Sequence, residues 1–236
     1  MKSRFLLESI IGPRTLQTAL ELTASVALYA HGKGPALILI DDHLPYPQAI
    51  LQVFGQIKHR RRRYGRGRFK HPRLKPPPNL QVGVVKKLRD NRGNLRKVSS
   101  QALFGQKKQI EKRIRTLGIG CKINTSHIER LNGTIRGQQA RLTRRTRTGS
   151  HLARMLQYSI WLWRDAYNWT RPHSSLSNKT PAMALGLAEE AWTVRRYILY
   201  PVHVSDLQRQ DWAEERNSVL ESAIDVYKRN KALPIS

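Results

Sequence analysis

The first 55 residues show two kinds of apolar pattern. Apolar side chains from Leu16 to Leu28 recur at i, i+3 and i+4 steps, which predicts an amphipathic helix ending before Gly32 and Gly34. Short apolar runs over 3–12 and 35–42 predict strands, the second buried on both faces. Residues 46–55 predict another helix. The order strand, helix, strand, helix indicates a layered α/β fold.

The pattern changes after residue 55. Residues 56–78 have no apolar period and end in three prolines, so we expect a solvated arm. Residues 79–105 read as a β-hairpin around the turn RDNRGN. Helices are then predicted over 106–118, from Thr125 or Ser126 to about Leu142, over 151–169 and over 206–229.

Charge is concentrated in the middle of the chain. Residues 56–155 hold 29 Lys and Arg side chains against three carboxylates, which is +26 of the total net charge of +27. Such a charge indicates a polyanionic partner, with nucleic acid as the first candidate and an anionic membrane surface as the second. The single cysteine, Cys121, cannot form an internal disulfide and fits a reducing cytoplasm. No apolar run is long enough for a membrane span, and no Cys and His spacing fits a structural zinc site.

Glu129 is one of the three carboxylates in this basic region. On a helix, Glu129, Asn132 and Arg136 share one face, which presents a carboxylate, an amide and a guanidinium together. The alternative is a capping box, because Ser126 and Glu129 have the S-x-x-E spacing.

Asp41 and Asp42 directly follow the predicted strand 35–42, at the carboxyl end where α/β sheets bind ligands. Only one of two adjacent residues points into a site there. The alternative is a polar turn or the N-cap of the helix that begins near Tyr46. Paired with Glu129, Asp41 suggests metal-assisted phosphodiester chemistry, in which carboxylates hold Mg²⁺ or Mn²⁺ and basic residues hold the polyanion.

Candidate DNA contacts come from the basic arm and from the segments around the predicted 125–142 helix. The run Arg60–Arg63 could be a solvated charge block, but its density favours phosphate contact. Trp161 and Trp163 are interpreted as core rather than as a base-stacking platform. The expected DNA-contacting side chains are Lys58, Arg60, Arg61, Arg62, Arg63, Arg66, Arg68, Lys70, Arg130, Arg144, Arg145 and Arg147.

Three ordered motifs resemble insertion-sequence DDE transposases, which share the RNase H-like fold of retroviral integrases. INTSHIERLNGTIRG matches the family pattern E-R-x-N-x-x-x-R at Glu129, Arg130, Asn132 and Arg136. LILIDDHLPY is similar to the segment of the second catalytic Asp, where a Tyr follows five residues on, which favours Asp41. YNWTRPHSSLSNKTPA resembles the tail motif Y-N-x-x-R-P-H-x-S-L followed by T-P-A.

The resemblance implies catalytic and metal-binding roles for Asp41 and Glu129, supported by Asp42, Asn132 and Arg136. It implies an RNase H-like mixed sheet flanked by helices, Mg²⁺ or Mn²⁺ as cofactor, and DNA as partner. The protein would be a homo-oligomer on DNA, cytoplasmic, prokaryotic and nucleoid-associated. The expected organisation is a first part of the core over 1–55, a basic arm over 56–80, the remaining core with an inserted hairpin over 81–187, and a helical tail over 188–236.

The sequence departs from the family in two respects: the 88 positions from Asp41 to Glu129 are far more than in retroviral integrases, and the first catalytic Asp is missing. No Asp precedes Asp41, whereas the family carries its first catalytic Asp on the first strand. We therefore expect an N-terminally truncated chain that lacks this strand and is inactive in strand cleavage. The leading interpretation is a DDE transposase or its remnant. The alternatives are a non-catalytic nucleic-acid-binding protein, such as a truncated transposase acting as an inhibitor, and a basic nuclease or RNA-binding protein unrelated to transposition.

Overall fold

The computed structural model describes residues 3–30, 37–58, 73–143, 147–200 and 221. These residues divide into two compact units. The sheet unit contains residues 14–110, and the helical unit contains residues 3–13 and 111–200. The helix predicted over 206–229 lies outside the described residues, apart from residue 221.

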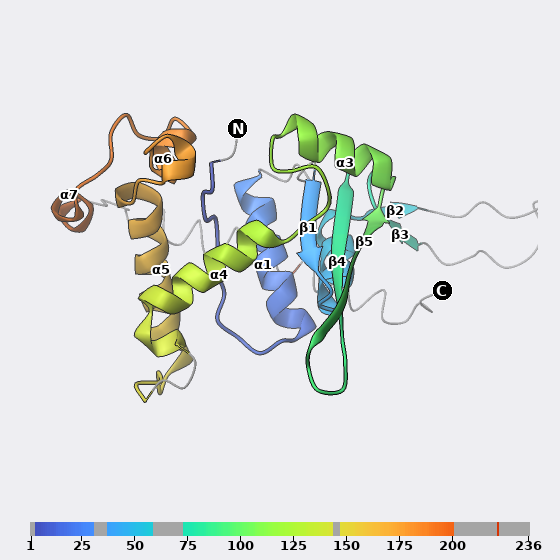
Figure 1. The fold of residues 1–236 in the computed structure, drawn as a ribbon, viewed down its shortest axis with the longest axis horizontal. Coiled ribbons are helices and arrows are strands. Elements are labelled where there is room, and N and C mark those ends of the chain that lie inside the picture. The colour runs from blue at the N-terminus through green and yellow to red at the C-terminus, as the bar shows by residue number, and fades with distance from the viewer. Residues whose placement is uncertain (1–2, 31–36, 59–72, 144–146, 201–220, 222–236) are drawn as a thin grey trace, which may run out of the picture. The chain divides into compact units, whose positions relative to one another are not determined.

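The sheet unit is built on a three-stranded mixed sheet (Figure 1). β1 (Leu37–Asp41) runs parallel to β4 (Gln81–Arg89), and β4 pairs antiparallel with β5 (Leu95–Phe104). The α/β class is therefore confirmed, as is the hairpin of β4 and β5. The prediction that this hairpin is an insertion is wrong, because β4 is the central strand of the sheet.

Two helices cover one face of this sheet. α1 (Leu16–Tyr29) and α2 (Pro45–Phe54) follow the predicted bounds closely. Thr15 caps α1, and α2 ends where a side chain at Gly55 would overlap the carbonyl oxygen of Leu51. Within β1 only Ile40 is buried, so the prediction of burial on both faces is wrong. The apolar core joins Ala27, Ile40, Ile50, Phe54, Leu80, Val82 and Val84.

The base of the basic arm is more ordered than predicted. β2 (Gln56–Lys58) and β3 (Arg73–Lys75) pair antiparallel, so the ends of the arm form a short ladder instead of a loop. The arm itself, 59–72, lies outside the described residues.

The helical unit contains most of the other helices. α3 (Lys107–Thr116) crosses the boundary between the two units, and its Ile110 and Ile114 are fully buried. α4 ends at Gln138, earlier than the predicted Leu142, because a separate 3₁₀ turn follows it. None of the described helices is both long and apolar enough to span a membrane. The elements after α3 are α4 (Ser126–Gln138), η2 (Ala140–Leu142), α5 (Ala153–Thr170), η3 (Ser174–Leu176), α6 (Pro181–Ala184) and α7 (Val194–Leu199).

The strand predicted over residues 3–12 does not form. The segment is bound instead by two amide side chains of α5. Asn168 accepts a hydrogen bond from the Leu6 amide and donates one to the Leu6 carbonyl, both at 2.9 Å. Gln157 accepts from the Ile11 amide at 2.6 Å and donates to the Ser9 carbonyl at 2.7 Å. These side chains replace the backbone partners that a sheet would supply.

Candidate functional site

Asp41 and Asp42 stand at the carboxyl end of β1, as predicted, and the structure separates their surroundings. Asp42 forms an ion pair with Lys86 of β4, with 3.8 Å between the carboxylate oxygen and Nζ. Asp41 pairs in register with Val85 and is exposed, and its carboxylate has no hydrogen bond or ion pair within the described part of the chain. Of the two, Asp41 is therefore the carboxylate without a described polar partner.

The helix after these residues does not use either Asp as its cap. The N-cap of α2 is Leu44, and no side chain bonds to the helix there. The predicted alternative that Asp41 or Asp42 caps this helix is therefore wrong. Burial raises the pKa of the Tyr46 hydroxyl, and the charge of the Asp41 carboxylate raises it further, whereas Arg14 lowers it. Tyr46 therefore lies within electrostatic range of Asp41.

Glu129, Asn132 and Arg136 all lie in α4, as predicted. At 3.6 residues per turn they share one face of this helix, and all three side chains are exposed. No residue of α4 is buried. A carboxylate, an amide and a guanidinium are thus presented together to solvent.

The capping-box alternative for Glu129 is wrong. α4 begins one residue earlier than the box requires, with Thr125 as N-cap, and the Ser126 hydroxyl donates to the Asn124 side chain at 2.8 Å. The Glu129 carboxylate instead accepts a hydrogen bond from the buried Thr125 hydroxyl at 2.6 Å. This bond fixes the orientation of Glu129 at the start of the helix, and only the i, i+4 spacing of Thr125 and Glu129 could have signalled it.

The structure does not bring the two predicted metal ligands into one described site. Asp41 belongs to the sheet unit and Glu129 to the helical unit. Among the residues that the structure describes, no group of three or more His, Cys, Asp or Glu side chains is placed to hold a metal ion.

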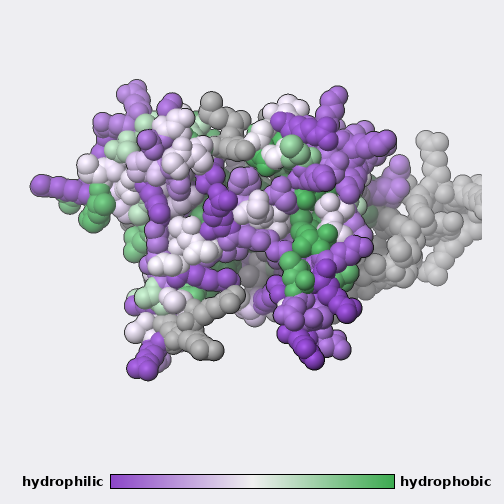
Figure 2. All heavy atoms as spheres, in the orientation of Figure 1, coloured by the Kyte–Doolittle hydropathy of each residue, from purple (hydrophilic) through white to green (hydrophobic). Residues whose placement is uncertain are grey.

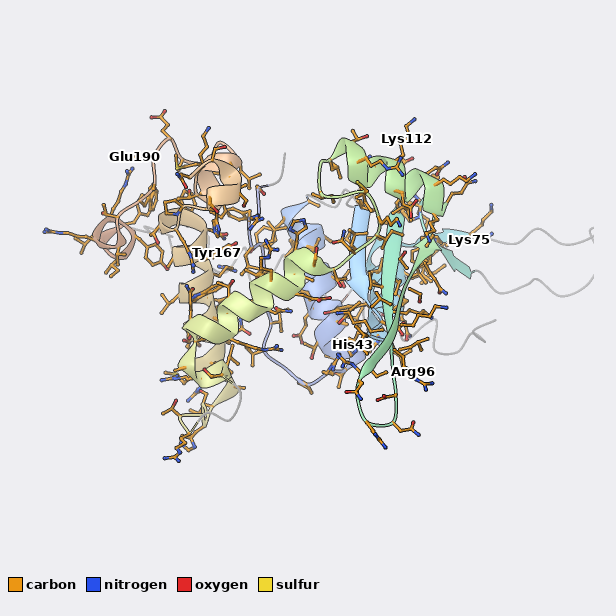
Figure 3. The ribbon with its side chains drawn as sticks, viewed as in Figure 1. His43, Lys75, Arg96, Lys112, Tyr167 and Glu190 are labelled. Atoms are coloured by element: carbon orange, nitrogen blue, oxygen red, sulfur yellow. The ribbon has the colours of Figure 1, made fainter. Side chains whose placement is uncertain are left out.

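The segment YNWTRPH organises the helical unit from within. Tyr167 (labelled in Figure 3) and Asn168, both in α5, are buried, and Asn168 holds the N-terminal segment through its two bonds to Leu6. The Tyr167 ring contacts the His173 ring edge-on at 4.8 Å between centroids. Thr180 caps α6, accepting a hydrogen bond from the Met183 amide at 3.2 Å. In this chain the motif therefore holds the N-terminal segment and packs its own aromatic side chains against each other.

The interpretation of Trp161 and Trp163 as core residues fits their contacts. Both are half-buried, and each indole N–H has a protein acceptor: Glu8 for Trp161 at 2.9 Å and Gln138 for Trp163 at 2.8 Å. The Trp163 ring also stacks on Tyr167.

The structure describes only part of the predicted DNA-binding set. Lys58, Arg130 and Arg147 are exposed, Lys58 at the end of β2 and Arg130 on α4. The remaining predicted contacts, in the ranges 60–70 and 144–145, lie outside the described residues. The sequence pattern does not single out the basic side chains of the β4–β5 hairpin, although they too are exposed.

Comparison with known families gives one finding. Residues 123–181 match the integrase core domain. This integrase core segment is about a quarter of the chain, lies wholly in the helical unit, and contains Glu129 and the YNWTRPH motif. Asp41 lies outside it. No curated protein and no solved structure matches the chain.

The match of the integrase core segment supports the resemblance seen in the sequence in its broad outline. It supports an integrase-like domain of the RNase H-like type and indicates a function in DNA recombination. It also implies interaction with DNA, in agreement with the strong positive charge of residues 56–155, which overlap the first part of the segment.

Proposed function

We propose that the protein is a DDE-type transposase, an enzyme class that cleaves and transfers DNA strands with the help of a divalent metal ion, or a remnant of such an enzyme. The observation that carries the proposal is the integrase core segment, because it contains the helix that presents Glu129 with Asn132 and Arg136. The strongly basic surroundings of that helix supply the electrostatic attraction that a DNA substrate requires.

The metal ion would be Mg²⁺ or Mn²⁺, held by Asp41 and Glu129. Both are exposed carboxylates, and carboxylate oxygens are the ligands that these hard cations prefer. The ion would polarise a phosphodiester and activate the attacking hydroxyl. The Thr125 hydroxyl orients Glu129, and Asn132 and Arg136 are placed on the same helix face to bind phosphate oxygen.

Asp42 has a supporting role in this proposal. Its ion pair with Lys86 leaves it less available to a metal than Asp41, and it holds a β4 cation beside the end of β1. We also propose that the protein acts as a homo-oligomer on DNA, because strand transfer must join two DNA segments.

A second candidate is a nucleic-acid-binding protein without catalytic activity, such as an inhibitory transposase fragment. One observation favours it. The middle of the chain carries +26 of the net charge, which is enough to bind a polyanion without any catalytic group. DNA binding would then be independent of both carboxylates.

Metal titration tests the leading proposal. Mn²⁺ binding to the full chain is measured by electron paramagnetic resonance for wild type, Asp41→Asn and Glu129→Gln, with Glu189→Gln, an exposed carboxylate outside the candidate site, as the matched control. Each of the first two substitutions should weaken binding about tenfold or more, since even partners outside the ligand set are worth about 10- to 100-fold. Glu189→Gln should change it little. Equal affinity in all four proteins would refute the assignment of the ligands.

A plasmid assay separates the two candidates. Mg²⁺-dependent nicking of supercoiled DNA that is lost in Glu129→Gln supports catalysis. DNA binding that neither the metal nor the two carboxylates affect, without nicking, supports the binding protein.

A further inference from the structure

The β4–β5 hairpin extends beyond the sheet to which it belongs. β1 pairs with β4 only as far as Asp41 and Val85, whereas β4 and β5 remain paired to Arg89 and Leu95. Residues 86–99, which we call the basic ribbon, therefore form a two-stranded projection past the carboxyl end of β1 (Figure 1). Most of its side chains are exposed, from residue 87 to residue 98 except Asp90.

The tip of the basic ribbon is a well-bonded turn. The Asp90 amide donates to the Asn94 carbonyl, the Gly93 amide donates to the Asp90 carbonyl, both at 2.9 Å, and Gly93 has a φ of 83°. This is the three-residue hairpin loop in which glycine takes the left-handed position. The Arg89 guanidinium donates to the Gly93 carbonyl at 2.8 Å and ties the strand to the loop. These hydrogen bonds stabilise the conformation of the turn at the end of the ribbon.

The basic ribbon carries six cations and one carboxylate. The carboxylate of Asp90 is engaged within the turn, where it accepts hydrogen bonds from the Arg92 and Asn94 amides at 3.0 and 2.8 Å. These bonds, those from Asn94 above all, lower the pKa of Asp90. A bulge opposite Leu88 and Arg89 makes Arg96 an extra residue in its strand, and bulges increase the twist of a ribbon. The cations are Lys86, Lys87, Arg89, Arg92, Arg96 and Lys97.

Figure 2 shows hydrophilic side chains gathered over the distal end of this hairpin, and Figure 3 places Arg96 among them. Between the cations stand three exposed apolar side chains, Leu88, Leu95 and Val98, each more than half exposed. Cations and single apolar side chains therefore alternate along a narrow, twisted projection.

We propose that the basic ribbon inserts into the major groove of duplex DNA. The inference rests on the proposed function, and it specifies the part of the protein that binds the DNA duplex. The major groove is about 12 Å wide and admits a two-stranded β-ribbon, and paired strands lie only about 4.8 Å apart. The cations reach the phosphates on both sides of the groove, and the apolar side chains contact base edges such as thymine methyl groups.

The charge of the basic ribbon argues for DNA over a protein partner. A second copy of this chain carries a net charge of +27 and would be repelled by the ribbon. The ribbon also begins beside the candidate catalytic carboxylate within the same unit, since Lys86 pairs with Asp42 and Val85 is in register with Asp41. A duplex seated on the ribbon would therefore pass the carboxyl end of β1.

The test compares two triple variants of the full chain that lose equal charge. The ribbon variant is Arg92→Gln, Arg96→Gln and Lys97→Gln, which leaves the bond from Arg89 to the turn intact. The control is Lys107→Gln, Lys108→Gln and Lys112→Gln on the exposed surface of α3. Circular dichroism confirms that both variants fold, and fluorescence anisotropy measures binding to one DNA duplex and to double-stranded RNA of the same sequence over a range of salt concentrations.

For DNA, the ribbon variant should lower the slope of log affinity against log salt by about 2.7, at roughly 0.9 per phosphate contact, and the control should leave it nearly unchanged. For RNA the two variants should behave alike, because the major groove of an A-form helix is too narrow to enter. Equal slopes of the two variants on DNA would overturn the inference and leave the proposed function standing. A ribbon-specific loss of equal size on RNA would overturn the assignment to the major groove. Salt-independent DNA binding by the wild type would overturn both proposals.

Discussion

Asn168 is expected to hold the N-terminal segment in place through two hydrogen bonds. The substitution Asn168→Ala removes both bonds and keeps the backbone of α5. The side chain is 1 % exposed and makes both of its hydrogen bonds to one residue, Leu6. Alanine leaves the Leu6 amide and carbonyl without their partners and opens a small cavity beside α5. The structure offers no second amide at that point of the segment among the described residues, since Gln157 serves Ser9 and Ile11.

The magnitude follows from the two lost bonds. A buried donor or acceptor left without a partner costs about 1–3 kcal/mol. Leu6 itself is only half-buried, so water can reach part of the exposed backbone, and the lower end of this range applies. The total is about 2–3 kcal/mol. At about 1.4 kcal/mol per factor of ten, the segment should detach roughly 30- to 140-fold more often.

Hydrogen exchange of the Leu6 amide, followed by NMR, measures this detachment directly. A local measurement is needed because two units need not unfold in one step, and a single unfolding midpoint would then be ill-defined. Gln109→Ala on α3 is the control, since this amide side chain is exposed and its loss should matter by less than about 0.5 kcal/mol. Unchanged Leu6 exchange in Asn168→Ala, or a loss equal to that of the control, would refute the reasoning.

Two further predictions concern pH and salt. Burial, followed by the charges of Arg171 and Arg4, lowers the pKa of His173 below its ordinary 6.5, so neutral His173 stabilises the fold above about pH 6.5 and this contribution is lost as pH falls through the folded-state pKa. Trp161, Trp163, Trp169 and Trp192 lie in the helical unit with His173, so tryptophan fluorescence follows the unfolding of that unit. The midpoint of this transition should fall on acidification more in wild type than in His173→Gln, and parallel pH profiles would contradict this. Replacing all four residues of Arg60–Arg63 by Gln should reduce the salt slope of DNA binding by up to about 3.6. A slope equal to that of the wild type would show that these side chains are solvated charge only.

Local patterns predict the local elements well. The apolar spacing from Leu16 to Leu28 indicates α1, and the turn sequence around Gly93 indicates the β4–β5 hairpin, because the signals for a helix face and for a tight turn lie within a few residues. The mistakes concern distant partners. The run Phe5–Ile11 looks like a strand, but its backbone is bonded to side chains 146 to 162 positions away, which no local pattern reveals.

The same distinction applies to the candidate site. The face shared by Glu129, Asn132 and Arg136 is a property of one helix, so the sequence is enough to predict it. The parallel pairing of β1 with β4 joins strands separated by the whole basic arm, and for that reason the sequence pattern wrongly suggests an inserted hairpin. The partnership of Asp41 with Glu129 stays a prediction, because it depends on how two units meet.

The binding of Leu6 by Asn168 also sets an order of events during synthesis. The two residues are 162 positions apart, and a ribosome adds about 5–20 residues per second. Asn168 is therefore synthesised about 8 to 30 s after Leu6, and the two hydrogen bonds cannot form before that. Residues 3–11 emerge well before the helix that fixes them, so an apolar segment is accessible to chaperones and to other nascent chains until α5 has been made.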